Sequence, residues 1–199
     1  MTNSKRTFDF TLSFIMLFIL SPLMFIIIIT ILFLDRGNPF FHQLRVGRYG
    51  KGFTILKYRT MVVQTLHGRA EFDLDPTNRV TALGKFLRKT KLDELPQLIN
   101  ILKGDMSFVG PRPEVPYWTE YYTEKWKVVH EVRPGLTDPA SIKFRNEEQL
   151  LAASSEPKWF YQHEILPQKL ALGVDYVRNR SFWGDIKILW TTFKTILTK

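Results

Sequence analysis

A run of apolar residues near the N-terminus, from Phe10 to Leu34, constrains the fold of this chain more than any other feature. Its length of about 25 residues would let one helix cross the hydrocarbon core of a bilayer, which takes about 20. Ser21 and Pro22 lie at the centre of the run. Because proline has no amide hydrogen and its ring crowds the preceding turn, we expect a kink or break there. The run therefore predicts either a kinked transmembrane helix or two half-helices that enter and leave one leaflet.

Basic residues lie on both sides of this run. Lys5 and Arg6 precede it, and further lysine and arginine residues follow it. Positive charge favours the cytoplasmic side of a membrane, so a crossing helix would place one basic flank on the wrong side. We therefore favour a re-entrant helix-break-helix over residues 1–36, with the Ser21 hydroxyl bonded to the Leu17 carbonyl at the bend. A kinked spanning helix is the alternative, since such helices are tolerated in membranes.

Composition limits what the remaining 37–199 segment does. It is long enough for one compact catalytic domain. The net charge of +9 suits an anionic membrane surface, nucleic acid or a phosphorylated ligand, and the apolar N-terminus favours the first and last of these. The sequence contains no cysteine, which excludes disulfides and thiolate metal sites, and its four histidines lack the spacing of zinc ligands.

Short patterns along residues 37–199 predict a mainly α protein with a small β-hairpin, an α+β fold. Two strand patterns, residues 39–46 and 53–59, flank a glycine-rich turn and indicate the hairpin. Residues 181–197 carry apolar residues around one face and tryptophans, which suits an interfacial amphipathic helix as well as a helix packed on the core. Other helical patterns occupy residues 115–132, 146–153 and 157–178, and loops are expected at 67–79 and 133–139.

The segment from Lys91 to Pro113 carries the clearest chemical signal. Asp93 is a suitable N-cap, and Glu94 would begin a helix that Gly104 ends. For most Asp-Glu pairs we would infer only a capping box and surface ion pairs. The basic residues around this pair, described next, favour a different interpretation.

Arg112 lies between two prolines that fix its backbone, and Arg88 lies shortly before the carboxylate pair. The amide groups at a helix N-terminus attract anions, so a phosphate could lie between the carboxylates and the arginines. Mg²⁺ prefers carboxylate and phosphate oxygens, and a metal that neutralises a diphosphate allows a second anion to attack it. An aspartate could then serve as the nucleophile.

The 91–113 segment resembles the signature of the monotopic phosphoglycosyl transferases, a family of bacterial sugar transferases. The resemblance extends over nearly the whole chain. It includes Lys5-Arg6, Ser21-Pro22, Gln43-Leu-Arg45, and residues 57–61, 83–88 and 133–137. It implies a mainly helical catalytic domain on the cytoplasmic face of the bacterial plasma membrane, held by a re-entrant helix and interfacial helices.

By this resemblance the enzyme transfers a sugar 1-phosphate from a UDP-sugar to polyprenol (undecaprenyl) phosphate and releases UMP, in the first membrane step of polysaccharide or glycoconjugate assembly. Asp93 would form a covalent phosphoglycosyl-aspartate, and Glu94 and Asp93 would hold Mg²⁺. The implied partners are the UDP-sugar, the polyprenol phosphate and membrane lipid, with no nucleic acid, while a homo-oligomer stays open. The residues expected to bind substrate phosphate are Arg88, Arg112, Lys57 and Arg145.

One stretch departs from the family pattern. Many members continue the Pro-Gly-Leu-Thr sequence with glycine and an Ala-Gln or Trp-Gln pair, whereas residues 138–144 here are Asp-Pro-Ala-Ser-Ile-Lys-Phe. Arg145 keeps its register after this stretch. The carboxylate pair is unaffected, but the identity of the sugar stays open.

Two other functions remain open at this point. Asp73 and Asp75 form a D-x-D tripeptide, which could bind the metal of a conventional glycosyltransferase that releases UDP. No alternating strand and helix units accompany it, as a nucleotide-binding sheet would require. The charge of +9 alone would also suit a non-catalytic, membrane-anchored basic adaptor.

Overall fold

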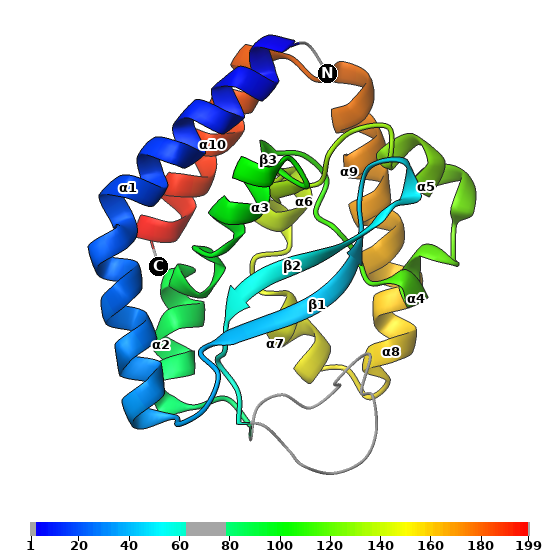
Figure 1. Ribbon diagram of the computed structural model, residues 1–199. Coiled ribbons are helices and arrows are strands. Elements are labelled where there is room, and N and C mark those ends of the chain that lie inside the picture. The colour runs from blue at the N-terminus through cyan, green and yellow to red at the C-terminus, as the bar shows by residue number, and fades with distance from the viewer. Residues whose placement is uncertain (1–2, 63–78, 199) are drawn as a thin grey trace.

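A computed structural model describes residues 3–62 and 79–198 of the chain (Figure 1). This part is mainly helical, as predicted, and it contains two small two-stranded sheets. The α-helices are α1 (Asn3–Leu34), α2 (Ala82–Thr90), α3 (Gln97–Lys103), α4 (Pro116–Thr119), α5 (Thr123–Val129), α6 (Pro139–Lys143), α7 (Glu147–Ala152), α8 (Pro157–Phe160), α9 (Leu166–Asn179) and α10 (Phe182–Leu197). The strands are β1 (Phe40–Val46), β2 (Gly52–Tyr58), β3 (Ser107–Val109) and β4 (Gly135–Thr137), and the shorter turns are η1 (Arg48–Gly50), η2 (Leu92–Glu94) and η3 (Tyr161–Ile165).

The predicted hairpin is confirmed as the antiparallel pair β1 and β2. Phe40 pairs with Tyr58 at the open end, and Val46 pairs with Gly52 beside the turn. Because alternate residues of a strand share a face, Ile55 and the residue two positions later, Lys57, lie on one side of β2. Ile55 is buried in a core cluster with residues of α3. The hairpin therefore brings Lys57 close to the start of that helix.

Asn100 joins α3 to the hairpin. Its side-chain amide donates to the Thr54 carbonyl over 2.8 Å and accepts from the Leu56 amide over 3.0 Å. These two bonds give the edge of β2 the partners that a neighbouring strand would otherwise supply. Since Lys57 follows Leu56 and Glu94 lies just before α3, the two halves of the candidate site are held in register.

The parallel pair β3 and β4 is a difference from the sequence prediction, which placed a loop at residues 133–139. Ser107 pairs with Gly135 across this sheet. A Cβ atom on Gly135 would lie 2.1 Å from the backbone nitrogen of Gly110, so only glycine allows the two segments to approach this closely. The proline and glycine residues that indicated a loop are therefore part of a tight strand pairing.

The aromatic stretch at 115–132 forms two short helices, α4 and α5. Tyr122 separates them with a left-handed backbone conformation, φ 57°. Trp118 and Trp126 are buried beside this turn, in a core cluster shared with η3 and α9. Ser181 caps α10 by accepting from the Gly184 amide, which confirms the predicted start of that helix.

α1 is one continuous helix, so the expected break at Pro22 is absent. Figure 1 shows instead that its axis changes direction about half-way along. The Ser21 hydroxyl donates to the Phe18 carbonyl over 2.8 Å, and not to that of Leu17 as expected. Phe18 is the residue whose carbonyl loses its helical partner, because Pro22 four positions later has no amide hydrogen. The serine therefore replaces the missing bond and the helix continues.

Both ends of α1 are tied to the rest of the chain. Near its start, Lys5 pairs with the buried Asp185, and Arg6 donates to two carbonyl groups at the end of α3 over 2.6 and 2.7 Å. At its other end, the carbonyl of Asp35 accepts from Arg59 over 3.1 Å. The helix thus lies along the domain, as Figure 1 shows, with each end fixed to it.

Much of the apolar surface of α1 and α10 faces outward. Within the described residues, Ser4–Leu34 is the helix that is long and apolar enough to cross a membrane, judged by length and composition. Phe18 is 79% exposed in α1, and Trp183 is 78% exposed in α10. Phe8 and Phe182 touch edge to face, so the two helices meet at their starts. Such an apolar surface on adjoining helices is typical of a protein that associates with a membrane.

Candidate active site

Asp93 and Glu94 lie in the turn η2 between α2 and α3. The expected N-cap role of Asp93 is wrong, because α3 begins only at Gln97 and has no side-chain cap. Lys91 reverses the chain before the pair with a left-handed conformation, φ 58°. Gly104 ends α3 as predicted, with φ 94°. Neither carboxylate is therefore used to cap the helix.

The carboxylate of Asp93 is buried, and few hydrogen bonds offset the loss of its hydration. It is 7% exposed, and its Oδ1 atom is buried without a hydrogen-bond partner among the described residues. Burial, followed by the charge of Glu94, raises the pKa of Asp93 above its usual value, against the opposing charges of Lys57, Lys91 and Arg112. A carboxylate with few hydrogen bonds keeps more of its basicity, which suits a nucleophile.

Glu94 has the opposite environment, since two cations bind it. The Lys57 ammonium lies 3.0 Å from Oε1. Both terminal nitrogens of Arg112 face the same carboxylate, one in a short contact with Oε1 and the other 3.4 Å from Oε2. Burial alone would raise the pKa of Glu94, but Arg112 and Lys57 outweigh it and hold this pKa well below the usual range. Glu94 in turn raises the pKa of Arg112, whereas burial lowers that of Lys57.

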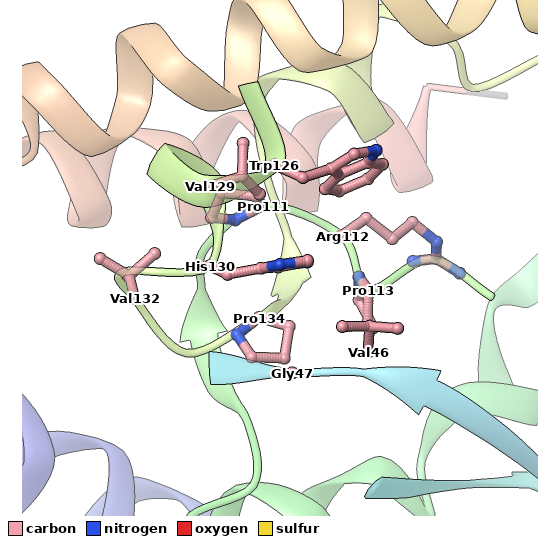
Figure 2. Close-up of a pocket in the computed structure, with 10 residues that line it drawn as sticks. All are labelled: Val46, Gly47, Pro111, Arg112, Pro113, Trp126, Val129, His130, Val132 and Pro134. Atoms are coloured by element: carbon pink, nitrogen blue, oxygen red, sulfur yellow. The ribbon is translucent and has the colours of Figure 1, made fainter. Parts of the chain in front are cut away.

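The turn that carries Arg112 is packed against a small, mainly apolar pocket. Pro111, Pro113, Trp126 and His130 are among the residues that line it. Figure 2 shows the guanidinium group of Arg112 pointing away from the other labelled side chains. The pocket contains neither carboxylate, so it is part of the support for the turn rather than the site of chemistry.

A buried ion pair supports this turn from the hairpin side. Arg45 donates to Glu114 over 3.1 Å and to the Pro113 carbonyl over 3.3 Å. The Tyr161 hydroxyl donates to the other Glu114 oxygen over 2.6 Å. Arg45, although a basic residue of the hairpin, therefore acts on the backbone next to Arg112.

The other predicted phosphate ligands lie elsewhere. Arg88 donates to the Thr60 hydroxyl over 2.9 Å and to Glu148 over 3.1 Å, which links α2 to α7. Arg145 is exposed in the turn after α6. Neither forms a hydrogen bond or an ion pair with Asp93 or Glu94 in the described part of the chain. Of the four predicted cations, the structure thus brings Lys57 and Arg112 to the carboxylate pair. Asp73 and Asp75 lie outside the described residues.

The carboxylate pair suits a metal ion that takes some of its ligands from the substrate. Among residues 3–62 and 79–198, no group of three or more acidic or histidine side chains could hold an ion. Asp93 and Glu94 supply two carboxylates, one with an unpaired oxygen. Mg²⁺ is commonly held by one or two carboxylates together with substrate phosphates. The pair therefore fits an ion that binds with a diphosphate.

Two polar residues near the pair were missed by the sequence analysis. Gln97 and Asn100 are 1% and 2% exposed, at inward positions of α3. Polar residues three apart in a short apolar helix, directly after two carboxylates, were the available signal.

The fold and the site together define a membrane-associated, mainly helical domain with a buried carboxylate pair flanked by cations. The chain belongs to the bacterial sugar transferase family, whose sequence profile matches residues 1–199, and this confirms the family indicated by the 91–113 segment.

Three relatives illustrate the range of the family. The chain is 41% identical to the "uncharacterized sugar transferase EpsL" of Bacillus subtilis, over 97% of this chain and 87% of that protein. It is 37% identical to the undecaprenyl-phosphate galactose phosphotransferase of Salmonella typhimurium, over 98% of this chain but only 40% of that protein. It is 33% identical to the UDP-glucose:undecaprenyl-phosphate glucose-1-phosphate transferase of Caulobacter vibrioides, over 98% of this chain and 70% of that protein.

Proposed function

We propose that this chain transfers a sugar 1-phosphate from a UDP-sugar to undecaprenyl phosphate and releases UMP. The names of the Salmonella and Caulobacter relatives support this reaction. The observation that carries it in the structure is the contrast between two adjacent carboxylates. Glu94 is neutralised by Lys57 and Arg112, whereas these cations act on Asp93 only through their charges.

In the first step, an oxygen of Asp93 attacks the β-phosphorus of the donor. A phosphorus–oxygen bond forms to Asp93, and the bond from that phosphorus to the bridging oxygen breaks. UMP leaves with the bridging oxygen and the electron pair, and a phosphoglycosyl-aspartate remains. Lys57 and Arg112 would balance the negative charge brought by the diphosphate, and fixed cations contribute most to catalysis where such charge develops.

In the second step, an oxygen of undecaprenyl phosphate attacks the same phosphorus. The bond to Asp93 breaks, and its electron pair returns to the carboxylate, so the enzyme is regenerated. Asp93 and Glu94 would hold Mg²⁺ with the diphosphate, where the ion neutralises phosphate charge. Arg88 and Arg145 stay candidates for contact with a more distant part of the substrate.

We further propose that residues 1–36 are re-entrant and that residues 37–199 form the catalytic domain on the cytoplasmic face of the plasma membrane. The fixed ends of α1 support this arrangement. A spanning helix has its ends on opposite sides of the bilayer, whereas Lys5 and Asp35 both bond to the same domain. The basic flanks favour the cytoplasmic side.

The reaction is tested by incubating detergent-solubilised protein with undecaprenyl phosphate, Mg²⁺ and each of a panel of UDP-sugars. We expect UMP from the wild type with at least one sugar and none from Asp93→Asn. Release of UDP would contradict phosphoglycosyl transfer and favour direct glycosyl transfer. Equal UMP release by both proteins would exclude Asp93 as the nucleophile.

A further inference from the structure

The side chain of Gln97 is buried and has no hydrogen-bond partner within the described part of the chain. The side chain is 1% exposed, and both its Nε2 and its Oε1 lack a partner among the described residues. Nearly all buried polar groups in proteins are bonded, so an unpaired buried amide requires an explanation. Asn100, the other buried amide of α3, is bonded through both its nitrogen and its oxygen. Of these two buried amides of α3, only Gln97 is unpaired.

The position of Gln97 points to Asp93. The two residues are four apart, and the residues between them that precede α3 are right-handed, Leu95 at φ −53° and Pro96 at φ −61°. Side chains four apart lie on one face of such a turn, and each leans toward the N-terminal end. Gln97 and Asp93 therefore lie on the same side of this turn. Each carries a buried polar atom without a partner, so the two side chains do not bond each other in this structure.

The cations around Asp93 do not meet this need. Lys57 and Arg112 both bond to Glu94, and Lys91 acts on Asp93 only through its charge. Oδ1 is thus left without a donor from any charged neighbour. Because Oδ1 is buried, Oδ2 is the oxygen that can face substrate.

We propose that Gln97 is a positioning residue for Asp93, with Nε2–H donating to Oδ1 in the working site and so turning Oδ2 toward the β-phosphorus. This inference rests on the proposed function. When Oδ2 has formed its bond to phosphorus, Oδ1 becomes the carbonyl oxygen of the acyl phosphate and still accepts from the amide. When that bond breaks, the electron pair returns to a carboxylate held in the same orientation. The amide keeps its hydrogens throughout.

The test is the rate of UMP release in a single turnover, with the UDP-sugar that the wild type uses and no acceptor. Gln97→Met keeps the length of the side chain and removes both polar atoms. We expect the rate to fall by about 100-fold, the cost of a misplaced reacting group. The donor KM should not change, because Gln97 is too buried to touch the donor. Gln149→Met makes the same change at an exposed position of α7 and should behave as the wild type.

A second variant separates the nitrogen from the oxygen. Gln97→Glu keeps an acceptor oxygen but has no hydrogen to donate when it is ionised, so at alkaline pH it should be as slow as Gln97→Met. Wild-type speed in Gln97→Glu would show that the oxygen, and not the N–H, is used, and would overturn the proposal. So would a wild-type rate in Gln97→Met, or a defect only in KM. A merely structural role would lower the amplitude and the Tm while leaving the rate of the folded fraction unchanged. Absence of UMP from the wild type with every sugar would instead remove the proposed function, and this proposal with it.

Discussion

The ammonium group of Lys57 lies 3.0 Å from a carboxylate oxygen of Glu94, and this contact joins the hairpin to the turn that carries both carboxylates. Arg112 reaches the same carboxylate from a third segment. Glu94 is therefore the point at which three separate parts of the chain meet. Removing its charge would leave two cations next to each other.

We expect Glu94→Gln to lower the free energy of unfolding by about 3 kcal/mol, because Lys57 and Arg112 would lose their buried counter-charge. Glu148→Gln provides a matched control, since it breaks the pair with Arg88 at a side chain that is 72% exposed. That change should cost less than about 1 kcal/mol. Chemical denaturation of both variants measures the difference in the free energy of unfolding. Equal losses in the two variants would contradict the inference that Glu94 holds Lys57 and Arg112 together.

Asp93→Asn should abolish UMP release without lowering the Tm. Burial and Glu94 raise the pKa of Asp93, so its ionised form is less favourable in the folded protein than in the unfolded chain. Asparagine removes that unfavourable charge and keeps the shape. Thermal unfolding at neutral pH measures the effect, and a Tm well below that of the wild type would show that the Asp93 charge stabilises the fold.

On the acidic side of the pH–rate profile, the midpoint of the fall in kcat/KM should lie at a pH above the usual aspartate pKa. Asp93 must be ionised to attack phosphorus, and its pKa is raised, so kcat/KM should fall as the pH drops through that raised value. Stability should also fall at acidic pH, because of Glu94. The pKa of Glu94 is lowered in the folded state, so its contribution to stability is fully present above about 4.5 and is lost as the pH falls from there through the lowered pKa. An activity profile that stays flat down to pH 4 would contradict the first expectation.

The Ser21 hydroxyl should matter only while Pro22 is present. Ser21→Ala leaves the Phe18 carbonyl without a partner, which should cost about 1 kcal/mol. Pro22→Ala restores an amide hydrogen for that carbonyl, so the serine change should then cost almost nothing. Thermal unfolding of the two single variants and the double variant in one detergent measures the coupling. Additive effects would show that the serine does not replace the bond lost at proline.

Local patterns were sufficient for part of this structure. Three predicted features depend on residues that are close together in the chain. They are the hairpin, the start of α10 at Ser181 and the glycine that ends α3. The β3 and β4 pairing depends on distant segments with loop-like composition, so no local pattern indicated it. The break at Pro22 was overestimated because a neighbouring side chain restored the lost bond.

Part of the candidate site could likewise be predicted from local patterns, and part depends on tertiary packing. The adjacent carboxylates and Arg112 stand out in the sequence because their residue types and spacing suit phosphate chemistry. Which cations reach the pair depends on tertiary packing, and this separates Lys57, which contacts Glu94, from Arg88, which turns to Thr60. Gln97 stands out in the sequence as a polar residue in a short apolar helix, but only the structure shows that its amide is buried without a partner among the described residues.

Because α1 lies along the domain, its removal would not yield a smaller soluble enzyme. Leu12, Met16 and Leu20 of α1 pack against the cluster that contains Leu98 and Ile101 of α3. Deleting the helix would uncover those residues and free the carbonyl groups that Arg6 now bonds. The most apolar helix of the described chain is thus also one wall of its interior, so the helix that follows the carboxylates depends on α1 for its packing.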